Sequence, residues 1–191
     1  MNNPSQDSIA SEDMAIGPIG IDIDRIRADA RLRVESGSVT GDYSADLGRL
    51  IALLRQSMAA EIVCFLRYTQ HAFAANGLRA EDVAREFREH AAAELGHAQN
   101  LARRVVQLGG EPDLSPTALL ASHATFSAGG DLEKMIVENL VEERVAIDWY
   151  RAAVAFVGDD DPTTRRLFEG ILADEEEHAD DLAGFIREHG S

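Results

Sequence analysis

Two parts of the sequence repeat one arrangement of side chains that can bind metal ions. In each copy a Glu is followed seven residues later by a Tyr, and 32 or 33 residues later by the pattern Glu-x-x-His. The copies consist of Glu61, Tyr68, Glu94 and His97, and of Glu143, Tyr150, Glu175 and His178. A four-helix bundle that holds two metal ions uses this ligand set, with one Glu from each of two helices and a Glu and His pair from each of the others. The repeat therefore favours an all-α fold built around a pair of ions.

Apolar residues at helical spacing predict the four helices that such a bundle needs. The first is expected to begin at Asp42 as its N-cap and to end near Asn76, before a glycine. The second is expected from about Ala80 to Leu108, where two glycines stop it. Because only a short connection joins them, these two helices are predicted to pack antiparallel as a hairpin.

The second half of the chain predicts another hairpin. Asp131 is expected to cap the third helix, and Asp161 followed by Pro162 is typical of the start of the fourth. Residues 109–130 are rich in Gly, Ser, Thr and Pro and are long for a connection inside a compact domain. We interpret them as a crossover along the bundle. The predicted class is all-α, with two antiparallel hairpins joined by this crossover.

The N-terminal part is predicted to be an extension of the bundle. Residues 1–15 are polar and aperiodic, which favours disorder. The stretch from Ile21 to Val34 has the amphipathic pattern of a short helix. We therefore divide the chain into an extension at residues 1–41 and a four-helix bundle at residues 42–191.

The ligand-type residues fall on the apolar stripe of all four predicted long helices. Phe87, Glu94, His97 and Leu101, for example, share one stripe. An uncompensated buried carboxylate costs several kcal/mol, and four facing carboxylates would also repel one another. Two divalent ions carry four positive charges and would neutralise the four Glu side chains. The alternative is that these residues are ordinary surface charges. In that case the buried face predicted from the apolar periodicity would have to be wrong in all four helices.

The mixture of carboxylate and imidazole ligands, without a thiolate, constrains the metal. It suits iron or manganese, whereas zinc would bind there without redox chemistry. We expect two iron ions per chain, with manganese and zinc as the alternatives.

Residues next to the six ligands carry weaker predictions. Tyr68 and Tyr150 lie two turns beyond Glu61 and Glu143 on the same helix faces. Each could donate its hydroxyl to a ligating carboxylate, or be a core tyrosine with a satisfied hydroxyl. Cys64 is expected to be a small buried side chain.

The histidines and acids outside the repeat are less informative. His90, one turn before Glu94, could contact the ligands or be a partly exposed helix residue. Glu176 and Glu177 are expected to point into solvent. No pattern supports a role for the three remaining histidines, His71, His123 and His189.

Composition excludes several partners. The net charge of −16, from 34 acidic and 18 basic residues, repels nucleic-acid phosphates and favours cations, although it also suits a plain solvated exterior. The single cysteine excludes an intramolecular disulfide framework, and the first residues show no signal-peptide pattern. No segment reaches the roughly 20 consecutive apolar residues of a membrane span. We expect a cytoplasmic protein without nucleic-acid or membrane partners.

Four segments resemble those of bacterioferritins and the wider ferritin-like superfamily. They are EIVCFLRYTQHAF, ELGHA, MIVENLVEERVAIDWYRAA and ILADEEEHADDL, within residues 45–187. The resemblance implies a ferritin-like four-helix bundle with a di-iron ferroxidase centre. By position it implies two terminal Glu ligands, two bridging Glu ligands and one His for each iron: Glu61 and Glu143, Glu94 and Glu175, and His97 and His178. It also implies Tyr68 as a catalytic residue that donates an electron.

Three features depart from bacterioferritins. Leu95 stands where that family has the methionine that binds haem, so haem is not expected. The chain stops 13 residues after His178, without the fifth helix that lines the channel of a 24-subunit cage. It also carries an N-terminal extension of about 40 residues. We expect a homo-oligomer, and a dimer, a twelve-subunit cage like those of Dps-like mini-ferritins and a larger cage all stay open.

The leading hypothesis is a di-iron ferroxidase that oxidises Fe(II) with dioxygen or hydrogen peroxide, for iron storage or detoxification. One alternative is a Dps-like cage protein that protects against peroxide without binding DNA, because residues 1–40 hold four arginines against seven acids. Another is a manganese catalase or a small di-iron oxidase, which the ligand spacing alone also permits. The short chain leaves little material for a substrate pocket, which disfavours the oxidase.

Overall fold

The computed structural model describes residues 19–77 and 80–189. Contacts divide the chain into two compact units, one up to Tyr43 and one from Ser44 onward. The described residues form helices and no β-strand, which confirms the all-α prediction. None of the described helices combines the length and the apolar character that a membrane span needs. The prediction of disorder at residues 1–15 falls outside the described residues.

The first unit contains the predicted short helix. It is α2 (Ile23–Leu32), followed by a 3-10 turn at Val34–Ser36. The side chain of Asp22 caps α2 by accepting from the backbone N–H of Arg25. None of the residues of α2 is buried. The helix is therefore held by local hydrogen bonds and ion pairs such as that between Arg25 and Asp42 (2.7 Å).

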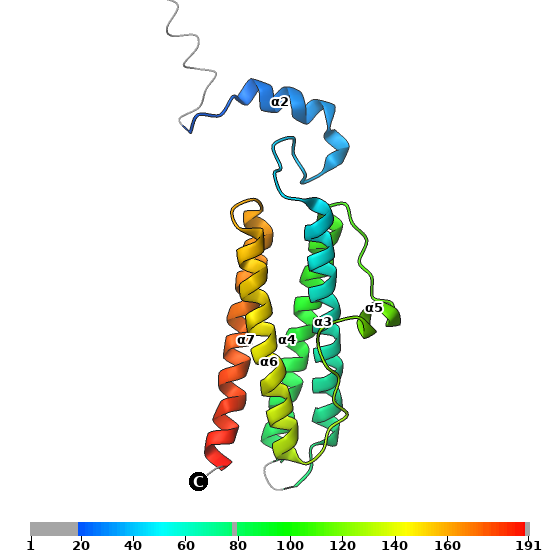
Figure 1. Ribbon diagram of the computed structural model, residues 1–191, viewed down its shortest axis with the longest axis vertical. Helices are drawn as coiled ribbons and strands as arrows, with labels where there is room; N and C mark the ends of the chain where they lie inside the picture. The colour runs from blue at the N-terminus through cyan, green and yellow to red at the C-terminus, as the bar shows by residue number, and fades with distance from the viewer. Residues whose placement is uncertain (1–18, 78–79, 190–191) are drawn as a thin grey trace, which may run out of the picture. The chain divides into compact units, whose positions relative to one another are not determined.

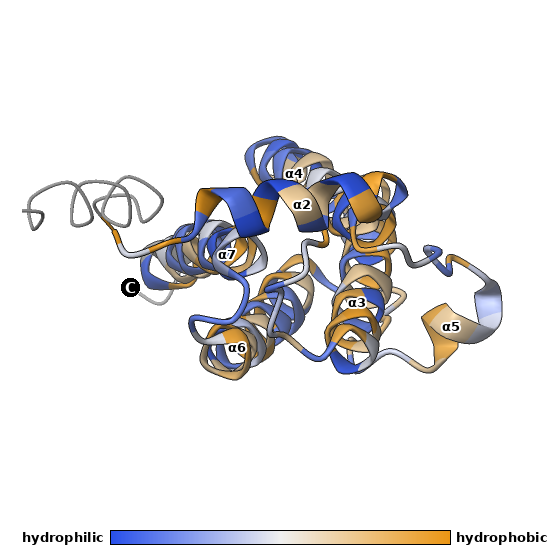
Figure 2. Ribbon diagram, turned by 90° about the horizontal axis from the view of Figure 1, so that it is seen from above, coloured by the Kyte–Doolittle hydropathy of each residue, from blue (hydrophilic) through white to orange (hydrophobic). Residues whose placement is uncertain are grey.

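The second unit is a four-helix bundle (Figure 1). Its long helices are α3 (Leu47–Ala74), α4 (Ala80–Gln107), α6 (Leu132–Val157) and α7 (Pro162–His189). Helices α3 and α4 form one antiparallel hairpin, and α6 and α7 form the other. Seen from above, α3, α4, α7 and α6 occupy the four corners in that order (Figure 2). Each corner carries both hydrophilic and hydrophobic residues, as expected for helices that bury one face.

The start of α3 differs from the prediction. Asp46, rather than Asp42, is the N-cap, and its side chain accepts from the backbone N–H of Arg49 at 3.1 Å. The prediction was wrong because two aspartates precede the apolar pattern, and the carboxylate nearest to the first helical turn caps it. The helix ends at Ala74, two residues before the predicted Asn76.

The predicted caps of α6 and α7 are confirmed. The side chain of Asp131 accepts from the backbone N–H of Lys134 at 2.8 Å. At the start of α7, Asp161 accepts from the backbone N–H groups of Thr163 and Thr164. Each carboxylate satisfies donors that the first helical turn leaves free.

Residues 109–130 form the crossover between the hairpins, with the short helix α5 (Pro116–Leu120) beside α3 (Figure 1). Buried polar side chains hold its second half. Arg67 donates to the carbonyl of Thr125, and His71 donates through Nε2 to the carbonyl of Ser127. Asn139 on α6 completes the network by contacting both Arg67 and His71. His71, for which the sequence showed no pattern, therefore fixes the crossover.

A second buried network joins the end of α4 to the start of α7. Arg104 donates to the carboxylate of Asp161 at 2.7 Å and to the hydroxyl of Thr164 at 2.8 Å. All three residues are buried. The network therefore ties the two hairpins together at one end of the bundle.

We predict that Arg104→Met destabilises the protein by about 3 kcal/mol, because it leaves a buried carboxylate without its cation. Urea denaturation monitored by circular dichroism measures this change. Arg103→Met is the control, since Arg103 is exposed and bonds only its neighbour Asn100 in the same helix. Equal stability of the two variants would contradict a structural role for the network.

Candidate metal centre

The six predicted ligand residues come together inside the bundle. Helices α3 and α6 contribute one Glu each, and α4 and α7 contribute one Glu and one His each. All six are buried, with exposed fractions of 7% or less: Glu61, Glu143, Glu94, His97, Glu175 and His178. The apolar face of each of the four helices therefore faces the interior of the bundle, as the periodicity predicted.

The first group of ligand atoms surrounds His97. Its Nδ1 lies 3.2 Å from Glu61 Oε2, 3.3 Å from Glu175 Oε1 and 3.6 Å from Glu94 Oε2. The opposite ring nitrogen, Nε2, donates to Asp174 at 3.0 Å. Such a bond orients the ring and directs the other nitrogen at a metal ion.

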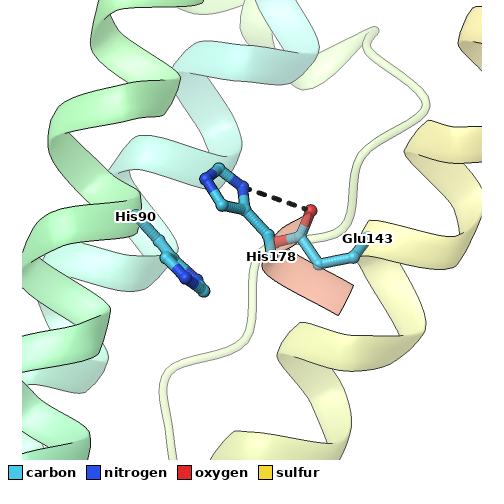
Figure 3. A group of neighbouring side chains, drawn as sticks. All are labelled: His90, Glu143 and His178. Atoms are coloured by element: carbon cyan, nitrogen blue, oxygen red, sulfur yellow. Dashed lines mark ion pairs between the residues drawn. The ribbon is translucent and has the colours of Figure 1, made fainter. Parts of the chain in front are cut away.

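The second group surrounds His178, whose ring is directed at Glu143 (Figure 3). Its Nδ1 lies 3.4 Å from Glu175 Oε2, 3.5 Å from Glu94 Oε1 and 4.0 Å from Glu143 Oε2. Glu94 and Glu175 each present one carboxylate oxygen to His178 and the other to His97. This is the geometry of two carboxylates that bridge two neighbouring ions.

Several buried polar atoms of the centre have no hydrogen-bond partner. Among the described residues, the buried side-chain atoms without a hydrogen-bond partner are His90 Nε2, Glu94 Oε1, both carboxylate oxygens of Glu175, and His178 Nδ1. An unpaired buried group costs about 1–3 kcal/mol. Two ligand atoms that share an ion at about 2.1 Å lie about 3.0–3.4 Å apart, close to the distances found here. The residues therefore fit a pair of divalent ions.

Electrostatics points to the same conclusion. Burial, together with the Glu94 carboxylate, raises the pKa of Glu61 to about 8, and burial with Glu175 and Glu94 raises the pKa of Glu143 well above its usual value. Burial opposes a charge on His178, but the Glu175 and Glu94 carboxylates outweigh it and raise its pKa to about 10. Without metal, protons thus supply the positive charge that the centre requires. Metal ions would have to displace them.

The two tyrosines cross over between the halves of the repeat. Tyr68 on α3 donates to Glu143 on α6, and Tyr150 on α6 donates to Glu61 on α3. Both rings are fully buried, and burial raises the pKa of each hydroxyl well above its usual value, so both are proton donors. Each terminal carboxylate is therefore held by the tyrosine of the other copy.

The sequence assigned no role to Asp174 and allowed two interpretations of His90. Asp174 bonds His97, although it directly precedes Glu175 and adjacent helix residues do not share a face. His90 is buried, and its ring stacks on that of His178 with 4.1 Å between centroids. His90 was predicted only as a contact or a partly exposed residue, and the structure supports the contact.

The crossover covers a narrow pocket that reaches the centre. Its lining includes His123 and Ala124 of the crossover, Cys64, and three of the buried acids, Glu61, Glu94 and Glu175. His123 stacks on Trp149 of α6 with 3.9 Å between ring centroids. Cys64 is buried as expected, and burial raises the pKa of its thiol well above the usual value.

The remaining predictions concern residues away from the centre. Glu176 and Glu177 are exposed, as predicted, and Glu176 pairs with Arg151 at 2.6 Å. The side chain of His189 lies outside the described side chains.

The ferritin-like domain family model matches residues 51–189. The chain belongs to the ferritin-like family. This confirms the resemblance drawn from the sequence segments. Within the family, this ferritin-like chain is similar to bacterioferritin from Rhodobacter capsulatus, with 25% identity over 135 residues that cover 70% of this chain and 80% of the relative. It is also similar to the DNA protection during starvation protein of Pyrococcus furiosus, with 30% identity over 137 residues that cover 70% and 74%.

Solved structures show the same ferritin-like fold. The structure of the bacterioferritin-related protein from Bacteroides fragilis, described as a dodecameric thioferritin, superimposes with a TM-score of 0.72 and 32% identity. The match covers 75% of this chain and 87% of that protein. Known proteins with this fold therefore span both bacterioferritins and starvation-protection proteins.

We predict that Glu143→Gln leaves the thermal stability of the metal-free protein nearly unchanged. Burial already raises the pKa of its carboxyl well above the usual value, so a neutral amide costs little there, and the amide oxygen can still accept from Tyr68. Stabilisation by Mn(II) should shrink, by about 1.4 kcal/mol for each tenfold loss of affinity. Differential scanning calorimetry with and without Mn(II) measures both effects, with the exposed Glu177→Gln as control. A large destabilisation of the metal-free variant would show that Glu143 serves the fold.

Proposed function

We propose that this chain is a ferroxidase that oxidises Fe(II) to Fe(III) at a di-iron centre, for iron storage or detoxification. The observation that carries the proposal is the pair of histidine groups that share Glu94 and Glu175, because a shared pair of carboxylates defines two adjacent metal positions. Similarity to a bacterioferritin supports iron as the metal. Haem is not part of the proposal, since Leu95 offers no sulfur ligand.

The proposed reaction balances with one electron from each iron. Two Fe(II) become two Fe(III), while dioxygen takes two electrons and two protons to give hydrogen peroxide. With hydrogen peroxide as the oxidant, the two electrons and two protons give two waters. Two adjacent irons suit this reaction because both electrons leave from one site. The carboxylates stabilise the extra positive charge that each iron gains.

Each residue of the centre has a proposed role. The two outer carboxylates each bind one iron, two further carboxylates bridge the pair, and one imidazole completes each ligand set. In that order these residues are Glu61 and Glu143, Glu94 and Glu175, and His97 and His178. Carboxylate and imidazole ligands without a thiolate suit iron and manganese, and zinc would bind without being oxidised. Two irons per chain is therefore the proposed stoichiometry.

The pocket under the crossover supports a small oxidant. It is small, and residues of the crossover and of the centre line it together. Dioxygen or hydrogen peroxide could pass, whereas an organic substrate would need a larger cavity beside the metals. This disfavours the alternative of a di-iron oxidase.

A second candidate is protection against peroxide without DNA binding. The 30% identity to a starvation-protection protein favours it. That relative's name refers to DNA, but the charge of −16 on this chain opposes contact with phosphates. In this case hydrogen peroxide would be the preferred oxidant. A manganese catalase would instead produce dioxygen from peroxide.

We predict that Fe(II) is oxidised rapidly until two irons per chain are consumed, and that Glu94→Gln/Glu175→Gln abolishes this fast phase. Stopped-flow absorbance after mixing with oxygenated buffer measures it. Glu176→Gln/Glu177→Gln is the matched control, because it removes the same charge from exposed positions. Comparison of dioxygen with hydrogen peroxide separates storage from protection, and oxygen evolution from peroxide would indicate a catalase. A fast phase that persists in the Glu94 and Glu175 variant would contradict the ferroxidase proposal.

We propose that Tyr68 donates an electron to the centre, whereas its counterpart Tyr150 only holds a carboxylate. Both donate to a terminal carboxylate, but only Tyr68 also contacts an imidazole, with 3.2 Å between its hydroxyl and His90 Nδ1. An electron removed from Tyr68 would leave a phenolic proton with Glu143 as a nearby acceptor. This supports Tyr68 as an electron donor to the centre.

We predict that Tyr68→Phe slows iron oxidation more than Tyr150→Phe, while both variants still bind two irons. Freeze-quench electron paramagnetic resonance during turnover should show a tyrosyl radical in the wild type and in Tyr150→Phe. A radical that survives in Tyr68→Phe, or equal rates in the two variants, would assign Tyr68 a positioning role only.

We propose a homo-oligomer, in line with the similar dodecameric protein. Three valines at steps of four form an exposed stripe on α6: Val137, Val141 and Val145, with exposed fractions of 39%, 49% and 42%. A stripe of this kind suits contact with another copy of the chain.

We predict that the wild type is an oligomer and that Val141→Asp shifts it toward smaller species. Light scattering coupled to size-exclusion chromatography measures the molar mass. Asn100→Asp, which adds the same charge at an exposed position of α4, should not change the mass. A monomeric wild type would overturn the proposal of self-association.

A further inference from the structure

A histidine outside the six-residue centre has an unused ligand atom. His90 on α4 is buried, with an exposed fraction of 3%, and its Nε2 has no hydrogen-bond partner. The ring stacks on that of His178, and Figure 3 draws the two histidines with Glu143. Packing alone would not require a nitrogen that is left without a partner.

The hydrogen bonds around Tyr68 define the protonation of His90. When Glu143 is a carboxylate, Tyr68 donates its only proton to it, so the tyrosine oxygen can only accept from His90 Nδ1. A neutral ring that donates through Nδ1 has its free lone pair on Nε2.

Two carboxylates face this lone pair. Glu86 Oε1 on α4 lies 3.3 Å from His90 Nε2, and Asp181 Oδ2 on α7 lies 3.7 Å away. The three ligand atoms lie within 4.8 Å of one another, and each is of a type that binds metal ions. The nearby Arg85 is paired with Asp82 and Glu89. Atoms that share an ion lie about 3.0–3.4 Å apart, so the distance from Glu86 falls in this range and that from Asp181 is slightly longer.

Burial and the negative charge of Asp181 raise the pKa of Glu86. Glu86 and Asp181 therefore disfavour each other's charge, as two carboxylates do when no cation lies between them. A divalent ion would remove this repulsion and would also satisfy His90 Nε2.

We propose that Glu86, His90 and Asp181 form a third site for a divalent transition-metal ion, from which the ion passes to the dinuclear centre. The set of one imidazole and two carboxylates suits Fe(II), Mn(II), Co(II) and Zn(II). The binding step stands on these three residues alone. The transfer step rests on the proposed ferroxidase function.

The position of the site supports transfer. The side chain of Asp181 is 47% exposed, that of Glu86 is 20% exposed and that of His90 is 4% exposed, so the ligands lead from solvent into the bundle. On the inner side, ligand atoms of His90, Glu143 and His178 again lie within 4.8 Å of one another (Figure 3). Potential ligand atoms are therefore present at the surface, at His90 and in the dinuclear centre.

Binding is tested with Co(II) and the full-length protein. Crystals soaked in Co(II) should show anomalous peaks at the two positions of the centre and a third among Glu86, His90 and Asp181. Glu86→Gln/Asp181→Asn should lose only the third peak. The control Glu89→Gln/Asp180→Asn, which removes the same charge from exposed positions of the same helices, should keep all three.

These results separate the two proposals. An empty third position beside a fully occupied centre would overturn the third site. An occupied third position beside an empty centre would keep the third site and overturn the di-iron function. Equilibrium dialysis should agree, with three Co(II) per chain in the wild type and two in the Glu86 and Asp181 variant.

Transfer is tested by iron oxidation at limiting Fe(II). The Glu86→Gln/Asp181→Asn variant should oxidise Fe(II) several-fold more slowly than the wild type and the control variant. The difference should vanish at saturating Fe(II), because the centre can then load without the outer site. Equal rates at limiting Fe(II) would overturn the transfer step.

Discussion

Repulsion among four buried carboxylates is the constraint on which the rest of this structure depends. Glu61, Glu94, Glu143 and Glu175 meet inside a four-helix bundle where Leu or Ile would pack at no electrostatic cost. Without metal, the centre compensates by holding protons, which raises the pKa of Glu61, Glu143 and His178. A pair of divalent ions would replace those protons and satisfy the unpaired oxygens of the bridging carboxylates. The stability of the metal-free chain is therefore limited by the same side chains that we propose for function.

The surrounding structure holds this centre in shape. Each half of the repeat supplies the tyrosine that bonds the terminal carboxylate of the other half, so the two hairpins position each other's ligands. Asp174 orients His97, and the ring of His90 supports His178. The crossover, fixed by Arg67, His71 and Asn139, contributes to the pocket beside the buried acids. The hydrogen bonds that hold the crossover are thus different from those that hold the six residues of the centre.

Much of the fold and of the centre follows from the sequence because both depend on local periodicity. A Glu at a position where Leu is expected is visible in the sequence, so the burial of the six residues together and three of the four helix starts were predictable. The N-cap Asp46 was missed because local patterns do not distinguish it from Asp42. The role of His71, the bond from Asp174 to His97 and the free Nε2 of His90 arise only when separate helices meet. Pairings between helices require the tertiary structure, and a single sequence does not contain them.

The central claim is that two cations share the bridging carboxylates Glu94 and Glu175. Electron paramagnetic resonance of the Mn(II)-loaded protein tests it most directly, because two ions joined by carboxylates interact magnetically. We expect the spectrum of a spin-coupled Mn(II) pair at two ions per chain in this centre. The hyperfine pattern of isolated Mn(II) ions at that loading would contradict it.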